Sequence, residues 1–418
     1  MIRRYLQPSV VKSLQHFPVV LLTGARQVGK STLAQDLIGK SWQASYLTLD
    51  DRVVLDGALR DPDGLISATP TPVVLDEVQK APDLMRAIKR RVDREKAAGQ
   101  YLLTGSANLM TLASVSETLA GRGALHTLMP FGWPERVERP VPSILKDLFD
   151  AQDSAALLKK LPKKTGSGSR KEIISTILSG GYPEPALMKS SEVRHRWFDS
   201  YRQTYLERDL LTIKSIENLP DFNRLLSLMA FRTGGLLNLS DLSRESGLPF
   251  TTLRRYVNLL EVTYQVFLLT PYYANIGKRL VKTPKVFMND TGMACYLRGV
   301  HDWSALEHQG QVGAMVETWA AAEILKLMAV TDYRFHLYFW RTHAGHEVDF
   351  LLELGGRLVA IEVKWSSKVG ESALSSLERC HDDLKGKLLR SVVLYGGTEV
   401  VALTPKITAV PYSVFFGM

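Results

Sequence analysis

The sequence predicts an α/β protein of several domains, the first of which is a doubly wound parallel sheet. An apolar, β-branched run leads through a glycine-containing loop into a helix-period pattern, and further apolar runs that end in polar residues alternate with helical patterns. The predicted strands are residues 18–23, 45–49, 73–77 and 101–108, and the predicted helices are 32–38, 82–98 and 109–120. Such alternation predicts a parallel sheet with its ligand at the carboxyl ends of the strands.

Composition indicates a globular chain of ordinary kind. Its 418 residues suffice for two or three domains, with 45% hydrophobic and 23% charged residues. The net charge of +9 is compatible with a polyanionic partner such as nucleic acid or nucleotide. The two cysteines, Cys295 and Cys380, have no metal-type spacing and suit a reducing compartment. Because no signal-peptide core and no run of about 18 apolar residues occurs, we expect a cytoplasmic protein without a membrane span.

Residues 24–31 fit the pattern G-x-x-x-x-G-K-[ST] of phosphate-binding loops. In such loops backbone N–H groups wrap a phosphate, and the N-terminus of the next helix adds partial positive charge. Lys30 is predicted to reach the β- and γ-phosphates, and Ser31 to ligate Mg²⁺. A chance match is the alternative, but the flanking strand and helix are of the required kind. The predicted nucleotide-binding residues are Gly24, Ala25, Arg26, Gln27, Val28, Gly29, Lys30, Ser31 and Thr32.

Two carboxylates, Asp76 and Glu77, close the apolar run that begins at Val73. The first can hold Mg²⁺ through water, and the second can polarise the attacking water. Carboxylates also end strands for solubility alone, but the loop upstream favours the catalytic interpretation. We therefore predict ATP and Mg²⁺ as cofactors, Ser31 and Asp76 as metal ligands, and Glu77 and Lys30 as catalytic residues.

Three further residues are weaker candidates for the same site. Ser106 or Asn108, at the end of a predicted strand, would sense the γ-phosphate, with a plain strand-to-helix turn as the alternative. Arg122 lies between two glycines and would stabilise transition-state charge in its own chain or in a neighbour's site. A surface turn is the alternative for Arg122.

Proline-rich and basic stretches suggest where the domains divide. The predicted segments are a P-loop core at 1–140, a linker or insertion at 141–170, a helical connector at 171–225, a winged-helix-like domain at 226–300 and an endonuclease-like domain at 301–418.

A helix-turn-helix pattern in the fourth segment predicts its winged-helix character. Helical patterns at 239–246 and 249–261 are joined by Gly247, and strand-like runs at 264–272 and 285–288 follow. The outer face of the second helix carries residue types that contact phosphates and bases, namely Thr251, Thr252, Arg254, Arg255 and Asn258. Basic residues between the two strands extend this charge, namely Lys278, Arg279, Lys282 and Lys285. Such units bind DNA or serve as protein-interaction spacers.

The last segment contains a second candidate site. Glu362 and Lys364 share one face of a predicted strand, and Asp349 on the adjacent strand can face them. Two carboxylates and a lysine suit Mg²⁺-dependent phosphodiester hydrolysis, and Glu317 on the preceding helix would complete the set. A salt-bridge cluster without chemistry is the alternative.

The chain as a whole resembles a group of prokaryotic AAA+-type ATPases with a C-terminal domain of uncharacterised function. The resemblance rests on the P-loop, residues 73–79, 101–108, 119–122, 180–185 and 205–209. The residues Glu317, Asp349, Glu362 and Lys364 resemble the PD-(D/E)xK signature of restriction-endonuclease-like folds, with Val348 where that signature has proline. The AAA+ resemblance implies a homo-oligomer, up to a hexameric ring, with ATP at subunit interfaces and Arg122 or Arg208 acting in trans.

The sequence therefore predicts an ATP-hydrolysing protein that acts on DNA as a DNA-dependent ATPase or remodeller. One alternative is an ATP-dependent, Mg²⁺-requiring nuclease. The other is a nucleotide-controlled switch that assembles with protein partners.

Overall fold

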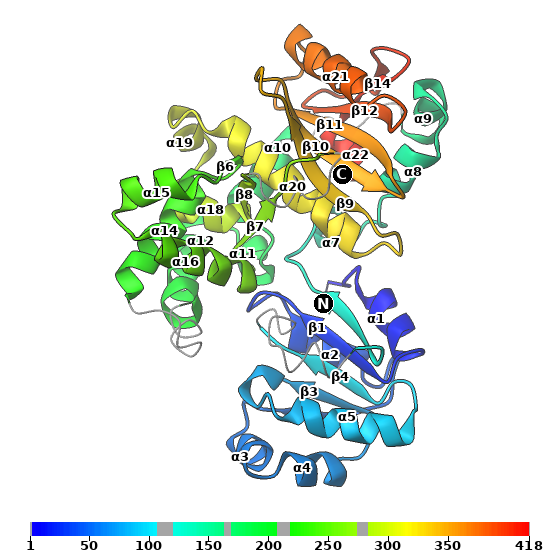
Figure 1. Cartoon of the computed structure of the whole chain (residues 1–418), viewed down its shortest axis with the longest axis vertical. Coiled ribbons are helices and arrows are strands. Elements are labelled where there is room, and N and C mark those ends of the chain that lie inside the picture. Colours follow the sequence, from blue (N-terminus) through cyan, green and yellow to red (C-terminus); the bar gives the residue numbers. More distant parts are fainter. Residues whose placement is uncertain (1, 107–119, 163–168, 207–217, 274–282, 418) are drawn as a thin grey trace. The chain divides into compact units, whose positions relative to one another are not determined.

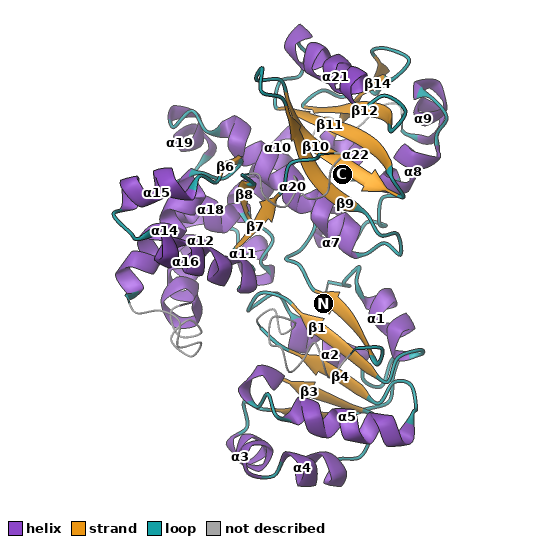
Figure 2. Ribbon diagram, in the orientation of Figure 1, coloured by secondary structure: helices purple, strands orange, loops and turns teal. Residues whose placement is uncertain are grey.

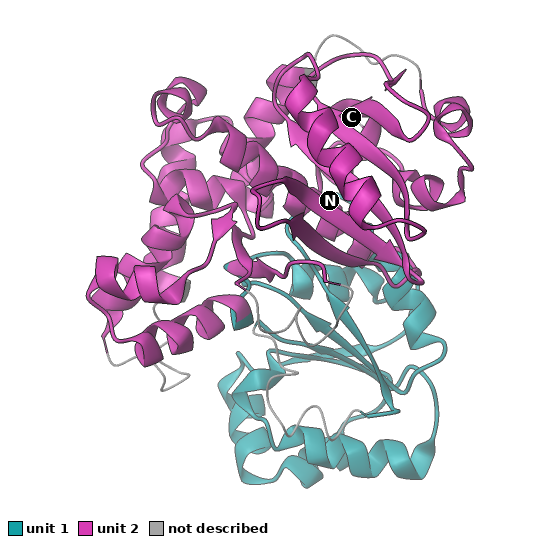
Figure 3. Ribbon diagram, turned by 45° about the horizontal axis from the view of Figure 1, so that its top comes forward, with its two compact units in different colours: residues 1–131, 262–265 teal, residues 132–261, 266–418 magenta. Residues whose placement is uncertain are grey.

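The computed structural model describes residues 2–106, 120–162, 169–206, 218–273 and 283–417. The chain divides into two compact units, which are coloured separately in Figure 3. Unit 1 comprises residues 1–131 together with the short segment 262–265, and unit 2 comprises residues 132–261 and 266–418. The boundary predicted at residue 140 lies close to the end of the first stretch of unit 1, at residue 131. The sequence did not predict that residues 262–265 also belong to unit 1.

Unit 1 is built on a parallel sheet of five strands in the order β2-β3-β4-β1-β5, which confirms the predicted sheet (Figure 2). The strands are β1 (Val19–Thr23), β2 (Ser45–Thr48), β3 (Val73–Asp76), β4 (Tyr101–Thr104) and β5 (Gly123–Thr127). The helices are α1 (Gln7–Leu14), α2 (Lys30–Leu37), α3 (Arg52–Arg60), α4 (Pro62–Ala68), η1 (Val78–Lys80) and α5 (Leu84–Glu95). Because all five strands run the same way, the ends of β1, β3 and β4 meet at one edge of the sheet.

The core of unit 1 explains why the apolar runs form strands. Leu21, Leu75 and Leu103 are buried on neighbouring strands and pack with Ile88 and Val92 of α5. Burial of such side chains stabilises the fold by roughly 1.5–3 kcal/mol each. Continuous apolar runs are the expected signature of a parallel sheet that is covered on both faces.

Unit 2 begins with helices and a small antiparallel sheet of order β6-β8-β7 (Figure 1). Its helices before the last domain are α7 (Trp133–Arg136), α8 (Ile144–Asp150), α9 (Ser154–Lys160), α10 (Ser169–Ser179), α11 (Pro183–Leu187), α12 (Ser191–Tyr201), η3 (Arg202–Leu206), α14 (Leu219–Phe231), α15 (Leu239–Ser246), α16 (Phe250–Val262), α18 (Thr291–Leu297) and α19 (Trp303–His308). The strands are β6 (Gly235–Leu236), β7 (Val266–Leu269) and β8 (Lys285–Met288).

The two helices of the predicted helix-turn-helix are both present, as are the two strands that follow them. Asn238 caps α15 by accepting from the backbone N–H groups of Ser240 and Asp241, and Gly247 ends the helix with a φ of 73°. β7 and β8 pair as an antiparallel hairpin. Of the predicted basic residues between these strands, Lys278, Arg279 and Lys282 lie outside the described residues.

Residues 144–160, predicted as part of a linker, form the helices α8 and α9 with buried faces. Arg390 of the last domain donates to the backbone oxygens of Ala151 and Asp153, the latter at 2.9 Å, and Ser154 donates to the carbonyl of Pro405. These contacts fix the junction between α8 and α9 against the last domain, because they satisfy two of its backbone carbonyls. The prolines and lysines of this stretch had suggested a linker. No local pattern in the sequence indicates its distant partners, Arg390 and Pro405.

The last domain is a six-stranded mixed sheet of order β13-β14-β12-β11-β10-β9, drawn in orange to red in Figure 1. Its elements are α20 (Val312–Ala329), β9 (His336–Arg341), β10 (Glu347–Leu354), β11 (Arg357–Lys364), α21 (Glu371–Asp383), β12 (Leu388–Tyr395), β13 (Val401–Ala402), β14 (Ile407–Pro411) and α22 (Tyr412–Phe415). β10 and β11 are antiparallel, with Phe350 opposite Ile361, so Asp349 and Glu362 are neighbours across the two strands.

Candidate functional site

The glycine loop has the backbone that its sequence requires. Gly24 has a φ of 144°, and a Cβ there would lie 2.3 Å from the carbonyl oxygen of Leu128. Gly29 precedes α2 with a φ of 91°, and Gln27 also has a positive φ of 62°. The positive φ values at Gly24, Gln27 and Gly29 therefore turn the chain sharply between β1 and the start of α2.

Lys30 is buried inside this loop. Its Nζ donates to the carbonyl oxygens of Gly24 at 3.0 Å and Ala25 at 2.8 Å. The loop itself therefore supplies two acceptors for this ammonium.

Ser31 and Asp76 join the loop to the end of β3. The Ser31 hydroxyl lies 3.0 Å from both carboxylate oxygens of Asp76. Tyr46 donates to the same carboxylate at 2.8 Å, and the hydroxyl of Thr104 donates to its other oxygen. Burial, together with the Asp76 carboxylate, raises the pKa of Tyr46, so this phenol stays a neutral donor. A hydroxyl and a carboxylate are the hard oxygen ligands that Mg²⁺ prefers, so these residues fit the predicted metal.

Glu77 follows Asp76 in a left-handed backbone conformation, with a φ of 61°. Its N–H donates to the hydroxyl of Thr104 at 3.3 Å, and Gln79 donates its side-chain amide to the Glu77 carboxylate. The same amide lies 3.0 Å from the hydroxyl of Ser106. Ser106 is thus linked to Glu77 through Gln79, and Asn108 lies outside the described residues.

Two residues that the sequence did not single out hold the loop from outside. Arg4 donates at 2.6 Å to the carbonyl of Val28 and at 2.6 Å to that of Met129. Tyr264, with a φ of 58°, donates to the hydroxyl of Thr23 at 2.9 Å, directly before the loop. Both are distant in sequence, so no local motif could have found them. Thr104 could have been found, because a polar residue ends its otherwise apolar strand.

Arg122 lies at the opposite edge of the sheet. It precedes β5, and its carbonyl accepts from the N–H of Val19 at the start of β1. Its guanidinium pairs with Asp93 of α5, with one N–O distance of 3.1 Å. Because the loop follows the other end of β1, the structure corrects the prediction of an action on nucleotide bound by the same chain. The role in a neighbour's site stays a prediction, and Arg208 lies outside the described residues.

The four predicted residues of the C-terminal site lie together. Lys364 Nζ is 2.7 Å from Glu362 Oε1, and the Val363 N–H donates to Asp349 at 2.7 Å. Burial raises the pKa of Glu317 to about 8 and that of Glu362 to about 7, and the Asp349 carboxylate adds to both shifts. The cause of both shifts is that these carboxylates are buried close to one another.

The sequence missed two members of this cluster, Lys285 and Glu347. Lys285 Nζ lies 2.8 Å from Glu317 and 2.5 Å from Glu347. Among the described residues, no three His, Cys, Asp or Glu side chains are grouped as the ligands of one metal ion. The predicted residues thus come together: Glu317 pairs with Lys285, Glu362 pairs with Lys364, and Asp349 accepts from the Val363 N–H.

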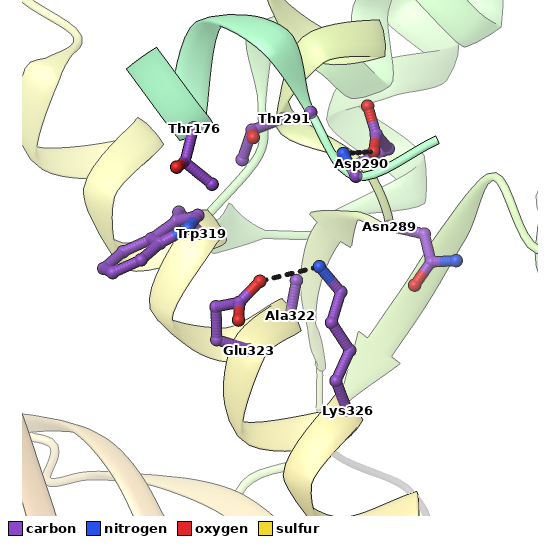
Figure 4. Close-up of a pocket in the computed structure, with 10 residues that line it drawn as sticks. Thr176, Asn289, Asp290, Thr291, Trp319, Ala322, Glu323 and Lys326 are labelled. Carbon is purple, nitrogen blue, oxygen red and sulfur yellow. Dashed lines mark hydrogen bonds and ion pairs between the residues drawn. The ribbon is translucent and has the colours of Figure 1, made fainter. Parts of the chain in front are cut away.

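Gly180 and Gly181 of the motif at residues 180–185 line a small pocket, shown in Figure 4. Asp290 accepts from the N–H groups of Gly181 at 2.6 Å and Met293 at 2.9 Å, and so joins the turn to the start of α18. A Cβ at Gly180 would lie 2.1 Å from the Asp290 carboxylate. The glycine at position 180 is therefore explained by its packing against a buried aspartate.

Within the described parts of the chain, no helix is both long and apolar enough to cross a membrane. The five-stranded parallel sheet, the glycine loop and the Ser31–Asp76 contact define an α/β P-loop domain. In agreement, residues 16–137 match the family described as "AAA domain". Residues 170–304 and 312–415 match two domains of unknown function, DUF8612 and DUF4143.

The whole chain is similar to proteins of two mycobacteria. The uncharacterized protein Rv2008c of Mycobacterium tuberculosis is 32% identical over 410 residues, which cover 98% of this chain and 83% of the relative. Mb2031c of Mycobacterium bovis matches equally. The chain belongs to the family of these proteins.

More distant similarities extend to archaea and to solved structures. The uncharacterized protein MJ1544 of Methanocaldococcus jannaschii is 19% identical over 381 residues, covering 88% of this chain and 79% of the relative. The Walker-type ATPase PABY2304 of Pyrococcus abyssi has a TM-score of 0.44 at 14% identity and covers 71% of this chain and 96% of that one. RuvB of Thermotoga maritima has a TM-score of 0.29 at 18% identity, with 63% and 87% covered.

Proposed function

We propose that this protein binds ATP with Mg²⁺ and hydrolyses it at the carboxyl edge of the unit 1 sheet. The observation that carries the proposal is the contact of Ser31 with both oxygens of Asp76, directly beside the glycine loop. The glycine loop follows β1, the Ser31 hydroxyl lies in the first turn of α2, and the Asp76 carboxylate ends β3. A magnesium–nucleotide complex needs all three groups at one place.

The residues of the site have distinct tasks in this proposal. Ser31 and Asp76 would hold Mg²⁺, and the ion, when bound, would offset charge that develops on the phosphates. Lys30 exchanges the carbonyls of Gly24 and Ala25 for phosphate oxygens. Glu77, oriented by Gln79, accepts a hydrogen bond from the attacking water, and Ser106 reports on the γ-phosphate through the same amide.

We further propose that nucleotide turnover is coupled to DNA. α16 exposes Thr251, Arg254 and Asn258 along one face, whereas Leu253, Val257 and Leu260 are buried on the other. An exposed helix face of hydroxyl, guanidinium and amide groups suits contacts to phosphates and base edges. The hairpin of β7 and β8 after this helix supports a winged-helix interpretation. A homo-oligomer, in which Arg122 serves a neighbouring site, belongs to the same proposal.

Phosphate release, measured with and without single-stranded, duplex and branched DNA, tests this function. We expect turnover in the wild type, a rise with at least one DNA form, and loss of turnover in Asp76→Asn. Tight nucleotide binding without turnover, together with no DNA affinity, would instead identify a nucleotide switch that assembles with protein partners.

A further inference from the structure

The cluster in the last domain contains a cation that its own domain does not supply. Lys285 is the first residue of β8, in the small three-stranded sheet, and only 4% of its side chain is exposed. Its Nζ lies 2.8 Å from Glu317 of α20 and 2.5 Å from Glu347 of β10, and 5.5 Å from the centre of the Phe339 ring. An ammonium so enclosed is a fixed part of the site and not a solvated surface charge.

The carboxylates are divided between two lysines. Lys285 forms ion pairs with Glu317 and Glu347, and Lys364 forms an ion pair with one oxygen of Glu362. The other oxygen of Glu362 is buried and has no hydrogen-bond partner, although Glu362 is only 5% exposed. A buried carboxylate oxygen without a partner is costly, and indicates a place where an additional cation or proton would be stabilised.

A divalent metal would need these same oxygens. Mg²⁺ requires near-octahedral oxygen ligands at about 2.0–2.1 Å, which Glu317, Asp349 and Glu362 would have to supply together with water. With Lys285 between Glu317 and Glu347, Glu317 is directed toward the ammonium. This agrees with the absence of a metal-type grouping among the described residues.

We propose that Lys285 is the resident cation of this cluster and keeps divalent metal ions out of it. The site is a latent metal site, which accepts Mg²⁺ or Mn²⁺ once the ammonium is removed. Because β8 carries Lys285 and pairs with β6 and β7, the small sheet and not the acid-bearing domain controls the site. The proposal does not depend on ATP hydrolysis in unit 1.

Mn²⁺ binding to nucleotide-free full-length protein, followed by electron paramagnetic resonance, tests this proposal. We expect the wild type and Asp349→Asn to bind Mn²⁺ equally, because the wild type holds no Mn²⁺ in this cluster. Lys285→Met keeps the length of the side chain and loses its charge, and we expect it to bind Mn²⁺ at least about tenfold more tightly than the wild type. Adding Asp349→Asn to Lys285→Met should abolish the new binding, which places the ion in this cluster.

Lys326→Met is the matched control. Lys326 is also a largely buried lysine in unit 2, and it pairs with Glu323 on α20 at 2.7 Å. Its substitution should create no Mn²⁺ site. If Lys285→Met does not fold, Lys285→Gln, which keeps an N–H donor toward Glu317, takes its place. Wild-type Mn²⁺ binding that is lost in Asp349→Asn would overturn the proposal, as would a folded Lys285 variant that binds no more Mn²⁺ than the wild type.

Discussion

The amide of Gln79 bridges Glu77 and Ser106, at 3.0 Å from the Ser106 hydroxyl. Glu77 follows β3 and Ser106 follows β4, so this one side chain joins the ends of two neighbouring strands. The carboxylate proposed to position water is therefore already held by a residue that also contacts the proposed sensor of the γ-phosphate.

Glu77→Gln should separate nucleotide binding from turnover. The amide keeps the size of the carboxylate but is a poor acceptor for a water proton, so we expect phosphate release to fall about 100-fold or more. Binding of a fluorescent ATP analogue should change little. The substitution Glu95→Gln, on the same unit but at the far end of α5, should leave both quantities unchanged. Turnover like that of the wild type in Glu77→Gln would remove Glu77 from the mechanism.

The acidic cluster predicts that unit 2 loses stability as pH rises. The pKa of Glu362 is raised in the fold from 4.5 to about 7, and that of Glu317 from 4.5 to about 8. The folded state therefore holds more protons than the unfolded state between these values, and stability decreases from the unfolded pKa up to the folded pKa. For Glu362 the loss is at most about 3 kcal/mol.

Urea unfolding followed by tryptophan fluorescence measures this loss, because every tryptophan except Trp42 lies in unit 2. Glu362→Gln imitates the protonated side chain and should flatten the dependence on pH, whereas substitution of the exposed Glu371 should not. A stability that rises with pH over this window would contradict the assignment.

Arg254→Ala should weaken DNA binding evenly across sequences if Arg254 contacts phosphate. The slope of log affinity against log salt should then fall by about 1. Fluorescence anisotropy at several salt concentrations measures it. Arg379→Ala removes the same charge from an exposed position on α21 and serves as the control. Equal effects of the two substitutions would argue against contact through α16.

Arg122→Ala tests action between subunits. An arginine that completes a neighbour's site should lower turnover by about 100-fold or more without weakening nucleotide binding. Mixing Arg122→Ala with Glu77→Gln subunits should restore some turnover, because each protein supplies what the other lacks. If Arg122 only pairs with Asp93, its loss should lower thermal stability slightly and leave turnover intact.

Local patterns in the sequence were sufficient for most of the fold. The helix predicted at 239–246 has those bounds in the structure, and so does the strand predicted at 285–288. The ends of the helix are set locally, by the Asn238 cap and by Gly247. By contrast, helix α5 is shorter than predicted, since Lys96 takes a left-handed conformation with a φ of 49° and ends it at Glu95.

The loop could be predicted because its residues follow a fixed pattern along the chain. Asp76 and Glu77 could be predicted because they directly follow an apolar, strand-like run. The sequence did not indicate the partners of Arg4, Tyr264 or Lys285, which lie far away in sequence. Lys285 was predicted as one of the basic residues of the winged-helix strands, but it is buried among carboxylates. Only the fold brings β8, α20 and β10 together, and no periodicity within any one of them reveals the pairing.

Binding and hydrolysis of ATP by Lys30→Ala test the central claim most directly. Lys40, exposed just after α2 and paired with Asp36, is the matched control. With Mg²⁺ present, we predict that Lys30→Ala lowers phosphate release at least about 100-fold and weakens nucleotide binding, whereas Lys40→Ala behaves as the wild type. Hydrolysis in Lys30→Ala at the rate of the wild type would contradict the claim that the glycine loop holds the nucleotide.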